Sequence, residues 1–380
     1  MKSIVNFTAG CFCLFLALFN PGVGKMQSSI DETITQIVFN DNGSRIAVAT
    51  NFGVKIYDQN FVMLASLTSD VNKSFHIYAW HPDGQRIFIN GEYYDSATLT
   101  RSNTQDEFST FSPNGRLALQ MATDELGGYL IYDMMNRSLI NRIAAGEYFE
   151  ELTWSYDGAY LAAATGTYIV VMDVFDANHM VRIPIDGQTY TIAWNSVNYQ
   201  IAAQVTQSTI ISSTEQTTTE SIQIFDAVTG SNIQRIESTG DLQGNMYWTP
   251  DGRYFISQIG SNTFSVRDSI TYQVAEVFNT PEPIGATALS PYGGRLLYGT
   301  YLPLADNQSS LIIPSVYLPV PSDERLDEII KLCGLAPGVE ESLSTQALTA
   351  QLTTLPSGAI PPGCAADLIA VAQALQAQGE

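Results

Sequence analysis

A five-residue pattern recurs along the chain and limits what the chain can fold into. It joins a large apolar residue to a small polar residue and a turn rich in Asn, Asp and Gly. The copies are FNDNG at 39, WHPDG at 80, FSPNG at 111, WSYDG at 154, WNSVN at 194, WTPDG at 248 and LSPYG at 289. They start about forty residues apart, a period typical of β-propellers built from four-stranded sheets.

The first residue of each copy ends an apolar segment, and we expect it to wedge between neighbouring sheets. These wedge residues are Phe39, Trp80, Phe111, Trp154, Trp194, Trp248 and Leu289, which include all four tryptophans of the chain. The following polar residue can bond the turn backbone, and Gly permits a positive φ there. The sequence therefore predicts an all-β protein, a seven-bladed propeller of four-stranded antiparallel blades over residues 30–320.

An aspartate ends the third predicted strand of six copies. These repeat aspartates are Asp58, Asp95, Asp133, Asp173, Asp226 and Asp268. Together with the turn, they make the chain resemble the WD-repeat family of β-propellers, or looser bacterial propellers that share this turn. The Trp of that family's Trp-Asp pair is replaced in every copy, and its Gly-His pair is missing. The resemblance implies a rigid disc that binds partners through loops on one face.

The ring of strands can be closed in two ways. Either the segment before residue 34 supplies the outer strand of the last blade, or SVYLP at 315–319 supplies it from its own repeat. Few residues separate Gly24 from the first predicted strand. This favours closure by residues 315–319.

Residues 1–24 have the features of a secretory signal peptide: an early Lys, an apolar stretch over 4–19 and a Pro-Gly break. Because an Ala-x-Ala site is missing, the alternative is an anchor that stays attached. Lipidation at Cys11 is disfavoured, since most of the apolar run follows that residue. The protein is therefore predicted to be secreted or extracytoplasmic, with membrane contact only if this segment is retained.

Residues 322–380 change to a helical period. Leu326, Ile329, Ile330 and Cys333 share one face of a predicted helix that Gly334 ends, and a last helix is expected over 365–377. Cys333 and Cys364 are the two cysteines beyond the presumed signal, so we expect a disulfide between them. The helical tail is predicted to cap the disc, with a small docking module as the alternative.

Few residues of this chain point to catalysis or metal binding. The three histidines, His76, His81 and His179, lie in different parts of the repeat, and His81 occupies the polar turn position. We therefore expect no metal site, no cofactor and no catalytic residue. The formal net charge of −21 argues against nucleic acid and favours a neutral or cationic partner.

These features predict a non-catalytic, extracytoplasmic scaffold that recognises proteins or peptides and is not an enzyme. The Ser/Thr/Gln-rich stretch at 206–221 and two other long loops are expected to form the partner face. Its candidate residues are Thr123, Asp124, Thr206, Glu215 and Asp306. The alternative is a hydrolase or lyase acting on extracellular glycans, with Glu147, Glu150 and Glu151 as its acidic site.

Overall fold

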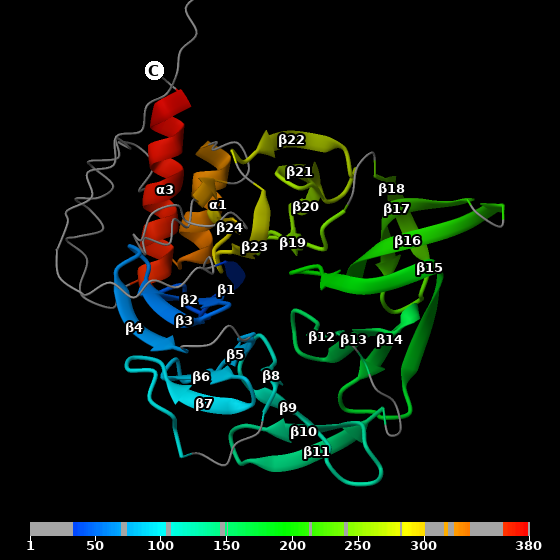
Figure 1. Ribbon diagram of the computed structural model, residues 1–380, viewed down its shortest axis with the longest axis horizontal. Coiled ribbons are helices and arrows are strands. Elements are labelled where there is room, and N and C mark those ends of the chain that lie inside the picture. The colour runs from blue at the N-terminus through cyan, green and yellow to red at the C-terminus, as the bar shows by residue number, and fades with distance from the viewer. Residues whose placement is uncertain are drawn as a thin grey trace, which may run out of the picture. The chain divides into compact units, whose positions relative to one another are not determined.

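The computed structural model describes residues 33–69, 74–103, 108–144, 149, 151–212, 215–238, 242–281, 283–300, 315–317, 323–334 and 360–378. From Glu32 onward they belong to one compact unit. Antiparallel sheets surround a common centre, and the first strand of each sheet lies innermost (Figure 1). The chain thus has an all-β, propeller-like fold with few helices.

Each sheet follows the sequence order of its strands. The strands are β1 Ile34–Phe39, β2 Arg45–Thr50, β3 Gly53–Asp58 and β4 Met63–Thr68; β5 Ile77–Trp80, β6 Arg86–Ile89 and β7 Glu92–Asp95; β8 Thr110–Phe111, β9 Leu117–Met121, β10 Tyr129–Asp133 and β11 Ser138–Ile143; β12 Glu151–Trp154, β13 Tyr160–Ala164, β14 Gly166–Asp173, β15 Met180–Trp194, β16 Gln200–Ser212, β17 Glu215–Asp226 and β18 Asn232–Glu237; β19 Met246–Trp248, β20 Tyr254–Gly260, β21 Thr263–Asp268 and β22 Val274–Asn279; β23 Ile284–Leu289, β24 Arg295–Thr300 and β25 Ser315–Tyr317.

The strands β12 to β18 form one seven-stranded sheet because β15 serves two repeats. Its first part pairs with β14, from Met180 opposite Met172, and its last part pairs with β16, ending with Trp194 opposite Ile201. The β16–β17 hairpin extends well beyond the ring (Figure 1). Within the described residues, the β5–β7 and β23–β25 sheets have three strands each, where the sequence predicts four.

Apolar clusters fill the seams between neighbouring repeats. One cluster joins Ile131 of β10 to Trp154 of β12 and Leu161 of β13. The first and last repeats pack in the same manner, with Ile37 and Ile46 against Ala288 and Leu297. The β25 strand comes from its own repeat, as the sequence favoured, but it pairs with β24 as the third strand of its sheet.

Indole side chains tie three of the seams by hydrogen bonds. The Nε1–H of Trp80 donates to Val38 O at 3.3 Å, that of Trp194 to Thr153 O at 3.1 Å, and that of Trp248 to Ala193 O at 3.3 Å. Each acceptor directly precedes the wedge residue of the preceding repeat. A tryptophan in this position therefore both fills the seam and satisfies its own polar atom.

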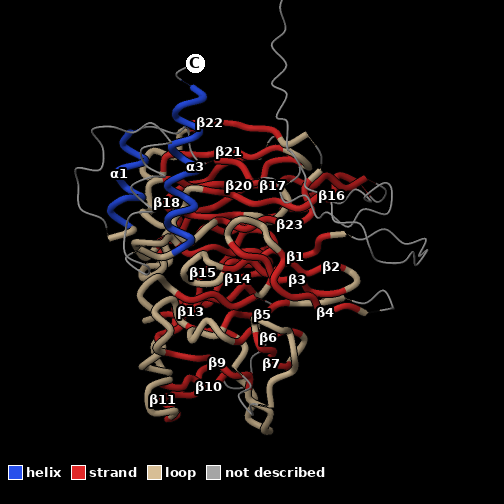
Figure 2. The backbone as a smooth tube through the Cα atoms, turned by 90° about the vertical axis from the view of Figure 1, so that its left-hand side faces the viewer, coloured by secondary structure: helices blue, strands red, loops and turns tan. Residues whose placement is uncertain are grey.

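The tail contains helices α1 (Asp323–Leu332) and α3 (Pro362–Gln378), which pack side by side (Figure 2). Leu326, Ile329 and Ile330 of α1 are buried against α3, as the predicted helical face requires. A disulfide joins Cys333 to Cys364 with a Cα–Cα distance of 5.9 Å. Such a bond is compatible with an extracytoplasmic protein. Within the described part of the chain, both helices fall short of the length and apolarity that a membrane crossing requires.

Candidate functional site

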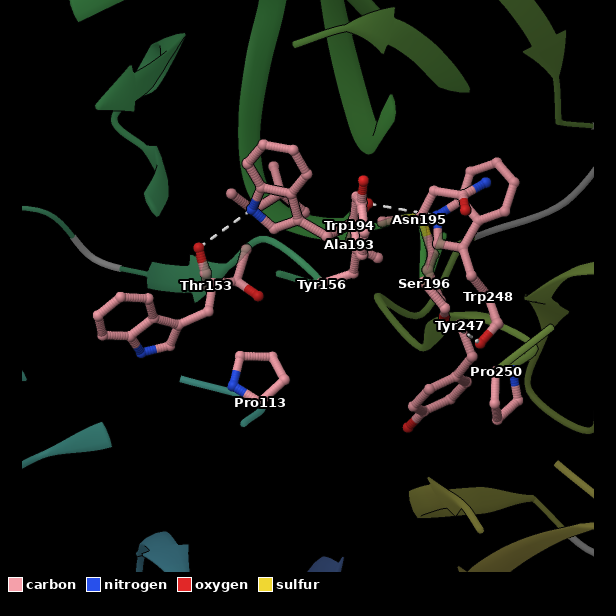
Figure 3. Close-up of a pocket in the computed structure, with 13 residues that line it drawn as sticks. Pro113, Thr153, Tyr156, Ala193, Trp194, Asn195, Ser196, Tyr247, Trp248 and Pro250 are labelled. Carbon is pink, nitrogen blue, oxygen red and sulfur yellow. Dashed lines mark hydrogen bonds between the residues drawn. The ribbon is translucent and has the colours of Figure 1, made fainter. Parts of the chain in front are cut away.

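The inner strands of repeats four, five and six enclose a cavity of about 490 Å³ at one end of the ring's centre. Trp194, Trp248, Tyr247 and Pro113 surround it, and the indole of Trp194 is fixed by its bond to Thr153 O (Figure 3). The remaining lining residues are Thr153, Trp154, Tyr156, Ile192, Ala193, Asn195, Ser196, Met246 and Pro250. The cavity is therefore walled by aromatic and proline rings with a few hydroxyl and amide groups.

A second cavity, of about 530 Å³, lies at the inner strands of the first and last repeats. Its lining shares Pro113 and Tyr247 with the first cavity, so the two adjoin. The residues special to it are Ile37, Val38, Phe39, Asn40, Asp41, Thr287, Ala288, Leu289 and Pro291. We call the two cavities together the channel mouth.

The channel mouth is almost free of charge. Asp41 is the one ionisable acid or base in the two linings apart from tyrosines, and burial raises the pKa of its carboxyl above the ordinary value. Burial also raises the pKa of Tyr247 to about 12, so its phenol stays neutral and bonds Thr287. The mouth contrasts with the chain as a whole, whose formal charge is −21.

The mouth residues occupy related positions in the repeat. Pro113, Tyr156, Ser196, Pro250 and Pro291 each stand two residues after a wedge. Sequence reasoning assigned them no role. The signal that could have found them is the run of prolines at this position, because ring closure brings equivalent turn residues together at one face.

Trp154 differs from the other three tryptophans. Its Nε1 is buried and has no hydrogen-bond partner among the described residues. In the pattern of the other seams, the acceptor would be the carbonyl of Thr110. The seam between repeats three and four therefore lacks the indole bond that Trp80, Trp194 and Trp248 make at theirs.

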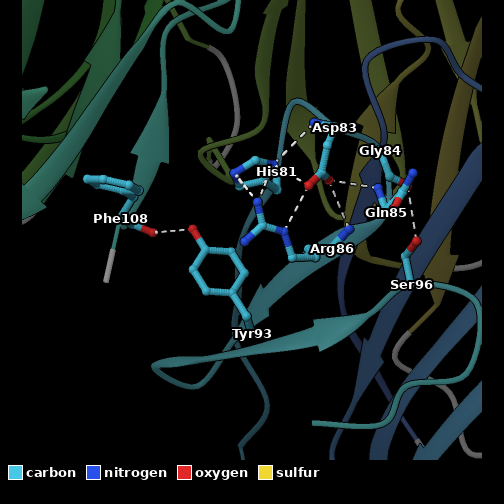
Figure 4. A network of polar contacts seen from close by, with 8 residues as sticks. All are labelled: His81, Asp83, Gly84, Gln85, Arg86, Tyr93, Ser96 and Phe108. Carbon is cyan, nitrogen blue, oxygen red and sulfur yellow. Dashed lines mark hydrogen bonds and ion pairs between the residues drawn. The ribbon is translucent and has the colours of Figure 1, made fainter. Parts of the chain in front are cut away.

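His81 is the one histidine buried in the described structure, and both ring nitrogens are engaged (Figure 4). Arg86 Nη2 lies 2.7 Å from Nε2, and Asp83 Oδ2 lies 2.9 Å from Nδ1. Because a guanidinium can only donate, Nε2 accepts from Arg86, while the backbone N–H of Asp83 donates to Nδ1 at 3.2 Å. Burial opposes ionisation of Asp83, but bonds from Gln85 and Arg86 hold the pKa of its carboxyl below the usual value.

The other two histidines lie on the surface. The ring of His76 contacts Tyr78, and His179 is 54% exposed beside Asp173. Neither belongs to the lining of the channel mouth. In the described ranges, no three His, Cys, Asp or Glu side chains gather in a way that could hold a metal ion.

The repeat aspartates cap local turns. Each accepts a backbone N–H two residues further on, at 2.8 to 3.1 Å, as in the bond from Ile270 to Asp268. This is Asx-turn chemistry, which orders the turn between the third and fourth strands. These bonds need no partner outside the turn. Any propeller with a tight turn between its third and fourth strands can therefore carry such an aspartate.

The residues predicted for a partner face are placed apart from the channel mouth. Thr123 and Asp124 are exposed, and Asp124 pairs with Arg142 at 2.5 Å. Thr206 lies in β16, and Glu215 starts β17. These loops connect second to third strands, so they emerge at the end of the ring opposite the mouth. Asp306, Glu147 and Glu150 fall outside the described residues, and Glu151 is placed only as the first residue of β12.

Comparison with known proteins identifies a family. The model of the cytochrome D1 heme domain matches residues 83–280. A solved chain of hydrazine synthase from Kuenenia stuttgartiensis has a TM-score of 0.57 at 14% identity, over 78% of this chain and 99% of that chain. At this identity the likeness shows the fold alone. No curated protein matches the sequence.

These findings correct the expectations from sequence. The resemblance to WD-repeat proteins is wrong, because the matching family is a different one and the shared aspartates are explained by local turns. A non-catalytic recognition scaffold, its glycan-acting alternative and the expectation of no enzyme are overturned as well. The finding that overturns them is the matching family, which is described as a cytochrome heme domain.

The described residues do not fit an iron porphyrin. Haem iron takes His, Cys, Tyr or a Met–His pair as axial ligands, and its carboxylates are held best by cations. Of these groups the mouth lining offers only Met246, without a His beside it, and two tyrosines: Tyr247, a neutral phenol bonded to Thr287, and Tyr156, which is exposed. The lining contains no His, Cys, Lys or Arg. His81, the buried imidazole, already has both nitrogens occupied.

The chain matches the family model even though the lining of its channel mouth does not suit an iron porphyrin. The family model covers more than half of the sequence, including the repeats that line the cavity of about 490 Å³. The chain belongs to the cytochrome D1 heme domain family.

Proposed function

We propose that this propeller binds a flat, uncharged, redox-active ring compound at its channel mouth. The observation that carries the proposal is the lining of the two adjoining cavities, where indole, phenol and proline rings meet almost without charge. Aromatic and proline surfaces favour flat rings, and an uncharged lining favours a ligand without carboxylates. The family, described as a cytochrome domain, supports a redox role for the ligand.

The size of the mouth agrees with a small organic molecule. The cavities of about 490 and 530 Å³ fall within the range of roughly 300 to 1,000 Å³ that holds such ligands. Hydroxyl and amide groups of Thr153, Asn195 and Ser196 can orient polar atoms of the ligand. An uncharged quinone combines these properties with redox activity, and we take quinones as the ligand class.

We also infer the arrangement and location in which the site works. The two pairings of β15 and the seven copies of the turn support a ring of seven blades, in which β15 supplies the outer strand of one blade and the inner strand of the next. The disulfide and the apolar first segment support a protein outside the cytoplasm, at the cell surface or in the periplasm.

The proposal is tested by titrating the protein with menadione, an uncharged naphthoquinone, while tryptophan fluorescence is recorded. Three of the four tryptophans line the mouth, so binding should quench their emission and saturate. Pro113→Lys places a long cation at the boundary of the two cavities and should weaken binding about tenfold or more. Pro82→Lys is the matched control, because Pro82 holds the same turn position outside the lining.

The titration separates binding of a quinone from binding of an iron porphyrin. Quenching that does not saturate, or that survives Pro113→Lys unchanged, would overturn it. A parallel titration with hemin addresses the family's own group. Tight binding of hemin, with a Soret band showing protein ligation of the iron, would contradict both the proposed ligand class and the conclusion that the mouth does not fit a porphyrin.

A further inference from the structure

The turn of the last repeat lacks the side chain that completes the turns of its neighbours. In repeat four, Ser155 Oγ donates to Asp157 Oδ1 at 2.7 Å, and the same oxygen accepts Ala159 N–H at 3.0 Å. Repeats three and six use Asn114 and Asp251 in the same way. In the last repeat this position is Tyr292, which has no carboxylate or amide to offer.

An aspartate of the C-terminal helix takes the missing place. Asp367 of α3 accepts Ser290 Oγ at 2.5 Å and Gly294 N–H at 3.0 Å, both through Oδ2. These are the two bonds that Asp157 makes within its own turn, at equivalent positions. The other oxygen of Asp367 accepts Arg295 Nε at 2.6 Å. Asp367 is fully buried and Arg295 almost so, so this pair is shielded from solvent.

The same region of α3 contacts the first repeat. Gly363 N–H donates to Asn42 O at 3.2 Å, and a Cβ on Gly363 would lie only 2.4 Å from the Cα of Gly43. Arg295 also reaches the first repeat, with Nη1 3.4 Å from Gln59 O. The helix end thus touches the turns of both the first and the last repeat.

The rest of the tail holds this helix in place. The α1–α3 cluster packs against Tyr292, the residue that replaces the turn acid. The disulfide at Cys364 lies one helical turn before Asp367 and ties α3 to the end of α1. Tyr292 therefore packs against the helices, and Asp367 makes the turn bonds that Asp157 makes in repeat four.

We propose that the C-terminal helix is a clasp that completes the last repeat and fastens it to the first. Sequence reasoning treated residues 322–380 as a cap or a docking module beside a finished ring. The ring is then complete only when α3 is packed against the first and last repeats. The inference concerns the fold of the ring and does not depend on which ligand the channel mouth takes.

The test is hydrogen exchange of the full oxidised chain, followed by mass spectrometry. Asp367→Asn keeps the shape but removes the charge that faces Arg295. We expect exchange to rise about tenfold or more in α3, in β1 and in β23, since opening the clasp exposes both sides of the seam. Asp157→Asn is the matched control, and its effect should stay within residues 151–164 and the surroundings of Tyr199, whose hydroxyl donates to Asp157 Oδ2 at 2.6 Å.

Two further variants keep the proposal falsifiable. Gly363→Ala leaves Asp367 intact but pushes α3 from the first repeat, and it should raise exchange in β1 more than Gly260→Ala, whose added Cβ meets only Thr263 at 3.7 Å. Asp367→Asn combined with Tyr292→Asp returns an acid to the last turn itself. It should protect the β23–β24 turn while α3 and β1 still exchange fast.

Three results would overturn the clasp. The first is faster exchange in α3 with β1 and β23 unchanged, which is the behaviour of a passive cap. The second is protection of β1 by the double variant, which would make α3 dispensable for the seam. The third is equal exchange in Gly363→Ala and Gly260→Ala.

Discussion

The two halves of the channel mouth are stabilised by different hydrogen bonds. The half at repeats four to six is lined by Trp154, Trp194 and Trp248, and two of these indoles bond the preceding repeat. The half at the first and last repeats has Phe39 and Leu289 in the wedge position, and the side chains of these residues have no N–H to donate. There a helix from outside the repeats supplies Asp367 instead. In both halves directional bonds add to the apolar packing, and these bonds come from different parts of the chain.

The largest effect should come from breaking the helix-fastened half. Asp367→Asn leaves Arg295 buried without a charge partner, which typically costs about 3–5 kcal/mol. Guanidinium unfolding should show this loss, with Asp157→Asn losing about 1 kcal/mol or less, because Asp157 is exposed to solvent. Equal losses in the two variants would mean that the two turns are fastened alike.

The indole-fastened half should respond less. Trp194→Phe removes the bond to Thr153 O but keeps a large ring in the seam, whereas Trp154→Phe removes an N–H that has no described acceptor. Trp194→Phe should therefore cost about 1 kcal/mol more than Trp154→Phe, the usual net value of one hydrogen bond. Thermal and denaturant unfolding of the pair measure the difference, and an equal or reversed order contradicts the assigned role of the bond.

The smallest effect concerns the local turns that both halves share. The Thr271 backbone and hydroxyl groups hold the pKa of Asp268 below its usual value. A carboxyl with a lowered folded pKa stabilises the protein above its unfolded pKa, near 3.8, and this contribution is lost as pH falls through the folded value. Asp268→Asn should therefore flatten the fall in melting temperature below about pH 4. An unchanged slope would show that the turn does not contribute.

The repeat made much of the ring predictable. The apolar residue, polar residue and Gly turn of each copy are contiguous, so the sequence located β1, β2 and the hairpin turns directly. The amphipathic face of α1 was equally readable, since Leu326, Ile329 and Ile330 recur at helical spacing. Local chemistry decides these elements, and local chemistry is visible in a sequence.

The site was not predictable in the same way. Pro113 and Tyr247 lie far apart in the chain and meet only because the ring closes. Asp367 is separated from Ser290 by 77 residues, and nothing in the helix period distinguishes it from other tail acids. The repeat aspartates misled the family assignment because an Asx turn looks alike in unrelated propellers.

The most direct test of the channel mouth as a ligand site is a crystal structure of the protein with saturating menadione. The account predicts density for the quinone between Trp194, Trp248 and Pro113, in contact with Tyr247, and no density in crystals of Pro113→Lys. A quinone bound only elsewhere on the ring, or an empty mouth at saturation, would contradict it.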